Sequence, residues 1–361
     1  LAAWWRDGTL CARRFAADGT PLADTIHNLS GYRDAAVAPD GTFRLVWPNG
    51  PFLRVFDTDG HPLTGEIRVG ESKVDELATA CDAEGRTIVV WVEKVRWDQN
   101  GYSRLVWGRL VDADGTPDGE AFVVHEIANG FANRLAVAMN ATGGFVITWS
   151  GGSSDSEERP DTWARAYRSD GAAVGPAVQV HVERSGRQDL AAPSIDARGR
   201  FVVAWYHNDQ SKEIRARRFH ADGTPAAEPF TIFGDLDGQY SPGVALLESG
   251  EILATYGGWE LGDKGSVFAQ YARLFGSDDQ PIGEQALVAE RQMYDPSLVF
   301  GPAGEFTVAY GERMITGRAG HVIPFDLAAG QQLTGDFSGY EIPVVAGREF
   351  EDRQRNGVKE P

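Results

Sequence analysis

The chain has little cysteine, little methionine, no long apolar run and too few basic residues to balance its acidic ones. Two cysteines in 361 residues exclude a disulfide framework, which needs several pairs. No stretch approaches the roughly 20 consecutive apolar residues of a membrane-spanning helix. The formal net charge of −18 argues against nucleic-acid binding, because that binding depends on Lys and Arg side chains at phosphates. We therefore expect neither a nucleic-acid partner nor membrane insertion.

Glycine and aromatic residues are abundant instead. The chain contains 43 Gly, 18 Phe, 10 Trp and 10 Tyr residues, against 3 Met. Many turn formers and aromatic residues with few helix formers are typical of all-β proteins. The composition therefore predicts an all-β fold.

One sequence pattern recurs along the chain. It begins with a small or apolar residue, has a glycine six residues before an aromatic residue, and ends in an apolar run. The six copies are Ala35–Trp47, Thr79–Trp91, Val137–Trp149, Pro193–Trp205, Val244–Tyr256 and Leu298–Tyr310. Internal repeats of this kind indicate a fold built from similar units.

Three further elements follow each aromatic residue. The first is an alternating segment such as Ile214 to Phe219, which is typical of a half-buried strand. The second is a turn of the type Asp222-Gly223-Thr224-Pro225, where glycine accepts a positive φ. The third is a short apolar strand such as Phe230 to Ile232. Each unit thus contains four strands, the number found in one β-propeller blade.

Seven copies of the turn, some of them degenerate, recur every 41 to 56 residues. We therefore predict a single seven-bladed β-propeller of four-stranded antiparallel blades, spanning residues 1–348. Blade 1 combines residues 1–31 with a first strand from residues 342–348, so that both termini close the ring and no edge strand stays open. Residues 349–361 form a polar tail.

The succession apolar–Gly–apolar–Trp, Arg–aromatic and Asp-Gly-Thr-Pro resembles seven-bladed propellers of secreted bacterial proteins, including parts of large repeat-rich surface proteins. The resemblance covers almost the whole chain and implies an extracellular or cell-surface location. It is specific for the fold, and propellers carry many functions. No catalytic motif of a family could be transferred from it. We expect a monomer.

In propellers, the loops from strand four to the next strand one and from strand two to strand three share one face, here called the top face. Its arginines could clamp carboxylates or sulfates, or could form salt bridges between blades. Its aromatic residues could stack on sugar rings, or could pack against neighbouring loops. The candidate ligand-binding residues are Arg33, Arg134, Arg291, Tyr294, Trp97 and Trp259.

A catalytic set is the alternative interpretation of the top face. In a β-elimination on a uronic acid, His207 would remove the C5 proton, Tyr240 would protonate the leaving oxygen, and Arg187 would stabilise the enolate-like charge. A pair of carboxylates such as Asp75 and Asp189 could instead serve a glycoside hydrolase.

No metal ligands are predicted, because the histidines are scattered and have no cysteine partners. No cofactor is expected, although the acidic segment 155–158 could hold Ca²⁺. The sequence favours a secreted or surface propeller that binds a polysaccharide or protein ligand in a groove of its top face. A polysaccharide lyase or glycoside hydrolase acting on an acidic glycan, and a structural propeller module of a larger surface protein, are the alternatives.

Overall fold

The computed structural model describes residues 2–6, 9–13, 26–29, 34–48, 50–72, 74, 76–96, 102–153, 160–183, 185–234, 242–262, 265–290, 297–300, 305–310 and 313–318. Packing divides the chain into two compact units: Leu1–Ser30 with Ile232–Pro361, and Gly31–Thr231. All described elements are strands, and among the described residues no helix is long and apolar enough to cross a membrane.

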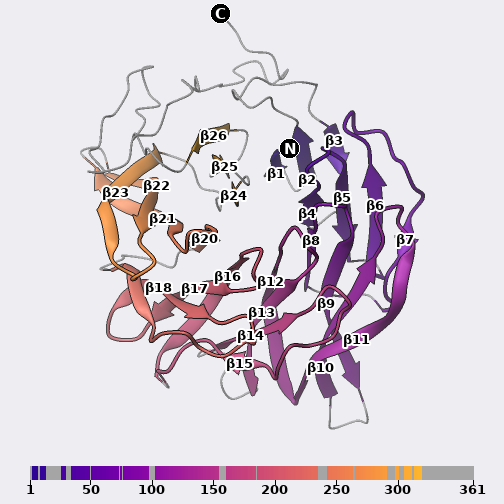
Figure 1. The fold of residues 1–361 in the computed structure, drawn as a ribbon, viewed down its shortest axis with the longest axis horizontal. Coiled ribbons are helices and arrows are strands. Elements are labelled where there is room, and N and C mark those ends of the chain that lie inside the picture. Colours follow the sequence, from indigo (N-terminus) through magenta and orange to yellow (C-terminus); the bar gives the residue numbers. More distant parts are fainter. Residues whose placement is uncertain are drawn as a thin grey trace, which may run out of the picture. The chain divides into compact units, whose positions relative to one another are not determined.

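The unit Gly31–Thr231 contains four four-stranded antiparallel sheets, which follow one another in Figure 1 from indigo to pink. Their strands are β4 (Asp34–Val37), β5 (Phe43–Trp47), β6 (Phe52–Phe56) and β7 (Ile67–Arg68); β8 (Glu76–Cys81), β9 (Thr87–Arg96), β10 (Tyr102–Val111) and β11 (Pro117–Ala128); β12 (Gly130–Met139), β13 (Phe145–Ser153), β14 (Asp161–Tyr167) and β15 (Val178–Gln179); β16 (Arg187–Ile195), β17 (Phe201–Asn208), β18 (Lys212–Phe219) and β19 (Phe230–Phe233).

The other unit contains three described sheets, two of them three-stranded. Their strands are β1 (Ala2–Arg6), β2 (Thr9–Arg13) and β3 (Ile26–Leu29); β20 (Pro242–Leu246), β21 (Ile252–Gly262), β22 (Gly265–Phe275) and β23 (Pro281–Glu290); β24 (Ser297–Phe300), β25 (Glu305–Tyr310) and β26 (Arg313–Arg318). The all-β prediction and the four-stranded antiparallel units are confirmed. The strand expected in 342–348 and the tail 349–361 lie outside the described residues.

Each repeat forms one sheet in which the strands pair in sequence order. The apolar run of the repeat becomes the second strand, as in β17, which is buried along almost its whole length. A strand is buried on both faces when sheets cover it from both sides, which explains why this segment is apolar throughout instead of alternating. The first strands β4, β8, β12 and β16 pack against one another in succession. This arrangement is consistent with a β-propeller.

Glycines with positive φ form the turns that the repeat predicted. Between the first and second strands, Gly85 and Gly199 have φ of +86° and +80°. Between the third and fourth strands, Gly223 has φ of +84°, and Asp222 Oδ1 accepts a hydrogen bond of 2.9 Å from the backbone N–H of Thr224. Glycine adopts this conformation without the steric cost that a Cβ brings.

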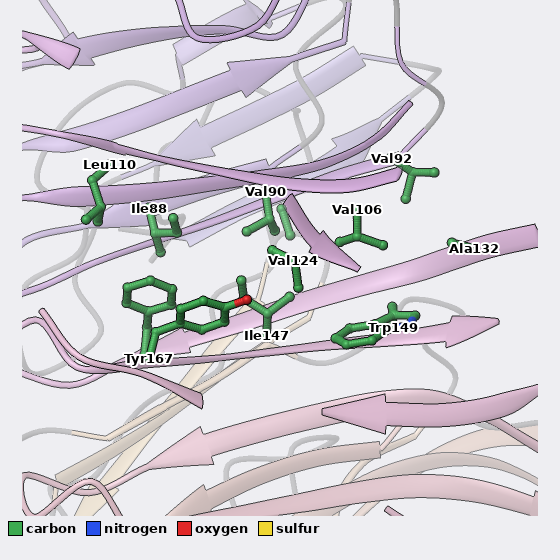
Figure 2. Close-up of a cluster of buried hydrophobic side chains, with 12 residues drawn as sticks. Ile88, Val90, Val92, Val106, Leu110, Val124, Ala132, Ile147, Trp149 and Tyr167 are labelled. Atoms are coloured by element: carbon green, nitrogen blue, oxygen red, sulfur yellow. The ribbon is translucent and has the colours of Figure 1, made fainter. Parts of the chain in front are cut away.

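Apolar side chains fill the space between neighbouring sheets. Figure 2 shows one such cluster, in which residues of the β8–β11 sheet face residues of the β12–β15 sheet. Ile88 and Val90 come from β9, whereas Ile147 and Trp149 come from β13. All four are buried, and burial of apolar area is the main force that joins the sheets.

A recurring arginine of the third strand also joins the sheets. Its guanidinium donates to a backbone carbonyl ten residues later in its own repeat and to a carbonyl of the preceding sheet, within or directly after its fourth strand. The three arginines with their two acceptors are Arg109 with Gly119 and Val69, Arg165 with Gly175 and Val124, and Arg217 with Ala227 and Val180. The Arg–aromatic motif of the sequence therefore has a structural role at each junction.

Candidate functional site

A cluster of hydrogen-bonded polar groups lies where β16 begins and β17 ends. The register pairs Gln188 with His207 across these two strands. The indole N–H of Trp205 donates to Gln188 Oε1 at 2.9 Å, and Gln188 Nε2 donates to the carbonyl of Ser185 at 3.1 Å. These two bonds fix the orientation of the Gln188 amide. His207 Nδ1 lies 2.8 Å from Nε2 and 3.0 Å from Oε1 of this amide, so Gln188 orients the imidazole ring.

His207 is only 6% exposed, and its surroundings disfavour the charged form of the ring. Burial lowers the pKa of His207 below its ordinary value of 6.5, and the nearby Arg215 guanidinium lowers it further, while Glu183, Glu213 and Asp209 act in the opposite direction. The ring is therefore neutral at physiological pH.

The lowered pKa of His207 predicts a loss of stability in acid. The unfolded chain binds the proton near pH 6.5, whereas the folded chain binds it only at lower pH, so the unfolded state takes up more protons in between. The stabilising effect of the neutral ring is complete above pH 6.5 and is lost as the pH falls. Urea denaturation between about pH 7 and about pH 5 should show a shallower pH dependence for His207→Gln than for the wild type.

The matched control is His61→Gln, because His61 lies in an exposed turn. This substitution should change the pH dependence of stability less than His207→Gln does. An equally steep loss of stability in His207→Gln and in the wild type would refute the assignment to His207.

Arg187 and Asp189 form an ion pair beside this network. Arg187 Nε donates to Asp189 Oδ2 at 2.8 Å, and a second guanidinium nitrogen contacts the same oxygen. The side chain of Asp189 is 3% exposed, whereas that of Arg187 is 35% exposed. The buried Oδ1 of Asp189 has no hydrogen-bond partner among the described residues. Because both residues lie on β16, this pair does not bridge two sheets.

Polar contacts connect this end of β16 with the preceding sheet. Thr162 Oγ1 donates to the carbonyl of Gln188 at 2.8 Å, and the Gln188 N–H donates to the carbonyl of Pro160 at 3.0 Å. Arg215 of β18 forms an ion pair with Glu183, which follows β15. His181, whose side chain is fully buried, contacts the Glu183 carbonyl through Nδ1 at 2.7 Å. The start of β16 is thus held from both sides.

The neighbouring repeat shows how unusual this region is. The aligned residues Trp149 and Trp205 and the matching strand registers define equivalent positions. At four of these positions β12–β14 carries Phe131, Ala132, Gly151 and Trp163, and β16–β18 carries Arg187, Gln188, His207 and Arg215. Small or apolar residues in one sheet are therefore replaced by polar residues in the next. We call Arg187, Gln188, Asp189, His207, Asp209, Lys212, Glu213 and Arg215 the polar end.

Among the described residues, acidic side chains outnumber basic ones at the polar end and in the adjoining segments 160–161 and 181–183 of the preceding sheet. Three cationic side chains, Arg187, Lys212 and Arg215, stand beside five acidic ones, Asp161, Glu183, Asp189, Asp209 and Glu213. The local charge therefore has the same sign as the net charge of the whole chain. Such a field repels anionic ligands.

Arg134 lies at an irregular position of β12. The register of β12 against β13 shifts between Asn133 and Ala136, and Arg134 has φ of +53° within this bulge. The equivalent bulge in β16 contains Leu190, with φ of +59°. β-bulges re-aim side chains and are frequent beside binding sites. The side chain of Arg134 is exposed and has no partner among the described residues.

The structure brings together only part of the predicted site. Arg187 and His207 lie on neighbouring strands, and Arg134 lies on the adjacent first strand β12. The backbone of Trp259 belongs to β21, opposite Phe268. The residues Tyr240, Arg33, Arg291, Tyr294, Trp97 and Asp75 lie outside the described residues. Their predicted roles remain predictions.

Two residues assigned to the top-face loops lie in strands. His207 belongs to β17, where its neighbour Tyr206 is 1% exposed and offers no open ring for a sugar. Trp259 belongs to β21, which continues to Gly262 and pairs with β22. Continued pairing satisfies the backbone hydrogen bonds of these segments, which a loop would leave to water.

Sequence reasoning missed Gln188, Glu183 and Arg215 as members of the site. One signal was available: in the unit Gly31–Thr231 the other three sheets pair two aromatic residues across the second and third strands, as in Trp91 with Trp107, whereas the β16–β19 sheet pairs Trp205 with Arg215.

The described residues contain one group with metal-binding geometry, Asp57, Asp59 and His61 in an exposed turn. Asp57 Oδ1 accepts hydrogen bonds of 2.8 Å from the backbone N–H groups of Asp59 and His61, so this carboxylate already has a structural role. The segment 155–158, for which Ca²⁺ was considered, lies outside the described residues.

No family model matches the chain, and no curated protein matches it. Solved structures do. A protein of unknown function from Dyadobacter fermentans matches with 10% identity and a TM-score of 0.50, over 78% of this chain and 92% of that one. An α-L-arabinofuranosidase from Fusarium graminearum matches with 11% identity and a TM-score of 0.46, over 77% and 87%. An ulvan lyase matches with 9% identity and a TM-score of 0.46, over 78% of both chains. At such identities the likeness concerns the fold alone.

Proposed function

We propose that the chain is a secreted or surface seven-bladed β-propeller, closed by strands from both termini, that binds a carbohydrate at the polar end of β16–β18. One observation carries this proposal: at the positions of Arg187, Gln188, His207 and Arg215, the neighbouring repeat has small or apolar residues in place of these hydrogen-bonding side chains. Carboxylate, amide, imidazole and guanidinium groups together offer the donors and acceptors that a hydroxyl-rich ligand requires.

The geometry supports binding more than structural reinforcement. A side chain that only joins sheets would bond across the junction, as Arg165 and Arg217 do. Arg187 instead pairs with Asp189 on its own strand and remains partly exposed. Arg134 likewise makes no bond to a neighbouring sheet within the described part of the chain.

The test converts the polar end into its counterpart in the preceding repeat. The full chain is run in affinity gels containing a panel of polysaccharides, beside the double variant Gln188→Ala/His207→Gly, which restores the residues of β12 and β13. We expect retardation of the wild type by at least one polysaccharide and an affinity lower by about tenfold for the variant. Arg168→Ala, in an exposed turn, is the control.

Circular dichroism of the double variant shows whether its sheets are intact, and Arg187→Ala is a second variant with a smaller packing effect. Unchanged retardation of both folded variants, or no retardation of the wild type by any polysaccharide, would contradict the proposal.

A lyase is the second candidate, and the state of His207 favours it. The ring is neutral near pH 7 and oriented by Gln188, as a general base requires. The pairing of Arg187 with Asp189 opposes it, because this arginine would have to stabilise negative charge on the substrate. Incubation with uronate-containing polysaccharides should produce the ultraviolet absorbance of unsaturated uronates if the lyase assignment holds, and His207→Ala should abolish it. Absence of this absorbance would leave the binding function alone.

A further inference from the structure

We infer that the carbohydrate bound at the polar end is uncharged, and that Asp189 and Arg187 together hold two of its hydroxyl groups. This inference rests on the proposed function. It concerns the class of glycan, which the sequence left open for a binding propeller and expected to be acidic only for the alternative enzyme.

The charge of the site is the first argument. The guanidinium of Arg187 is already neutralised by Asp189, and that of Arg215 contacts both Glu183 and Glu213. A uronate or sulfate would have to displace these carboxylates while surrounded by an excess of acidic groups. The repulsion between like charges costs more where the groups are shielded from water. An uncharged ligand avoids this cost.

The buried oxygen of Asp189 is the second argument. Oδ1 has no hydrogen-bond partner among the described residues, although the side chain is almost fully buried. A buried carboxylate oxygen without a donor is costly, so the site is completed by a group that donates a hydrogen bond. A sugar hydroxyl donates, whereas an ionised carboxylate or sulfate has no proton to offer. The unmet acceptor therefore selects for hydroxyl groups.

Arg187 supplies the complementary donor. Its Nε and one terminal nitrogen contact Asp189 Oδ2, and its other terminal nitrogen has no protein partner among the described residues. Among the described residues, the pair thus leaves one donor and one acceptor without a partner, and two hydroxyl groups of a sugar can satisfy them. Rotation of the partly exposed Arg187 side chain gives a ligand access to Asp189, and such rotations are fast.

The experiment measures the affinity of the full chain for neutral polysaccharides, such as galactan and xyloglucan, and for anionic ones, such as polygalacturonate and alginate, at low and high salt. We expect the neutral polymers to bind with affinities that change less than about twofold with salt. Asp189→Asn should weaken this binding about tenfold. Asparagine has only one side-chain oxygen, so it cannot accept hydrogen bonds from Arg187 and from the ligand on two separate oxygens.

Asp170→Asn is the matched control, because Asp170 is an exposed acid in a turn outside the polar end. It should bind like the wild type. Arg187→Gln tests the donor separately, and near-ultraviolet circular dichroism establishes that each variant is folded.

Three outcomes would overturn the inference. Salt-sensitive binding of anionic polymers would assign the site to an acidic glycan and leave the proposed function intact. If a folded Asp189→Asn variant binds neutral polysaccharides as tightly as the wild type, water and not the ligand donates the hydrogen bond to Asp189 Oδ1. Binding of no polysaccharide would refute the proposed function itself.

Discussion

Replacing Arg165 by methionine is expected to lower the free energy of unfolding by about 3 kcal/mol. Arg165 Nη1 donates to the carbonyl of Val124 at 2.8 Å, and Nε donates to that of Gly175 at 3.0 Å. The guanidinium carbon of Arg165 also lies 5.6 Å from the centroid of the Tyr167 ring. Methionine fills a similar volume but leaves the buried carbonyl of Val124 without its donor. Chemical denaturation of the full chain measures the effect.

Arg168→Ala is the control for charge. Arg168 is three residues away and pairs with Asp170, but both side chains are exposed, so its removal should change stability by less than about 1 kcal/mol. Equal effects of the two substitutions would show that the arginine of the third strand does not join the sheets. Because Arg109 and Arg217 make equivalent bonds, their replacement should resemble that of Arg165.

Gly85→Ala is expected to lower the free energy of unfolding by about 2 to 3 kcal/mol. Gly85 has φ of +86°, which alanine adopts with strain. A Cβ at this position would lie 2.2 Å from Arg44 Nη2, and Arg44 is buried beside it. The guanidinium would have to leave its hydrogen bond of 2.7 Å to Thr42 Oγ1.

Gly199→Ala separates the two causes. Gly199 occupies the same turn of another repeat with φ of +80°, but its Cβ would make only an ordinary contact of 3.4 Å with Ala221. This variant should lose about 1 kcal/mol, the cost of the backbone conformation alone. If thermal denaturation shows equal losses for the two variants, the close approach of Arg44 has no energetic consequence.

The repeat predicted the sheets well because each of its signals has a local cause. A glycine such as Gly199 can adopt a positive φ, an Asp-Gly turn such as that at Gly223 reverses the chain, and the apolar run of β17 requires cover on both faces. These preferences act within a few residues and therefore appear in the sequence.

The candidate site was harder to predict because it depends on register and on strand length. Whether His207 ends a strand or begins a loop is decided by pairing with β16 and β18, which no short-range signal specifies. The ion pair of Arg187 with Asp189 also depends on the directions of the two side chains, which the sequence does not specify. Comparison between repeats would have revealed the exception at Arg215, because its counterpart Trp163 is aromatic.

Hydrogen–deuterium exchange of the full chain, with and without a saturating neutral polysaccharide, tests the central claim most directly. The account predicts added protection in residues 183–189 and 205–213, which contain most of the polar end, and none in the Asp-Gly turns at Gly115 and Gly223. Protection that appears at those turns, while residues 183–189 and 205–213 exchange as in the free protein, would contradict it.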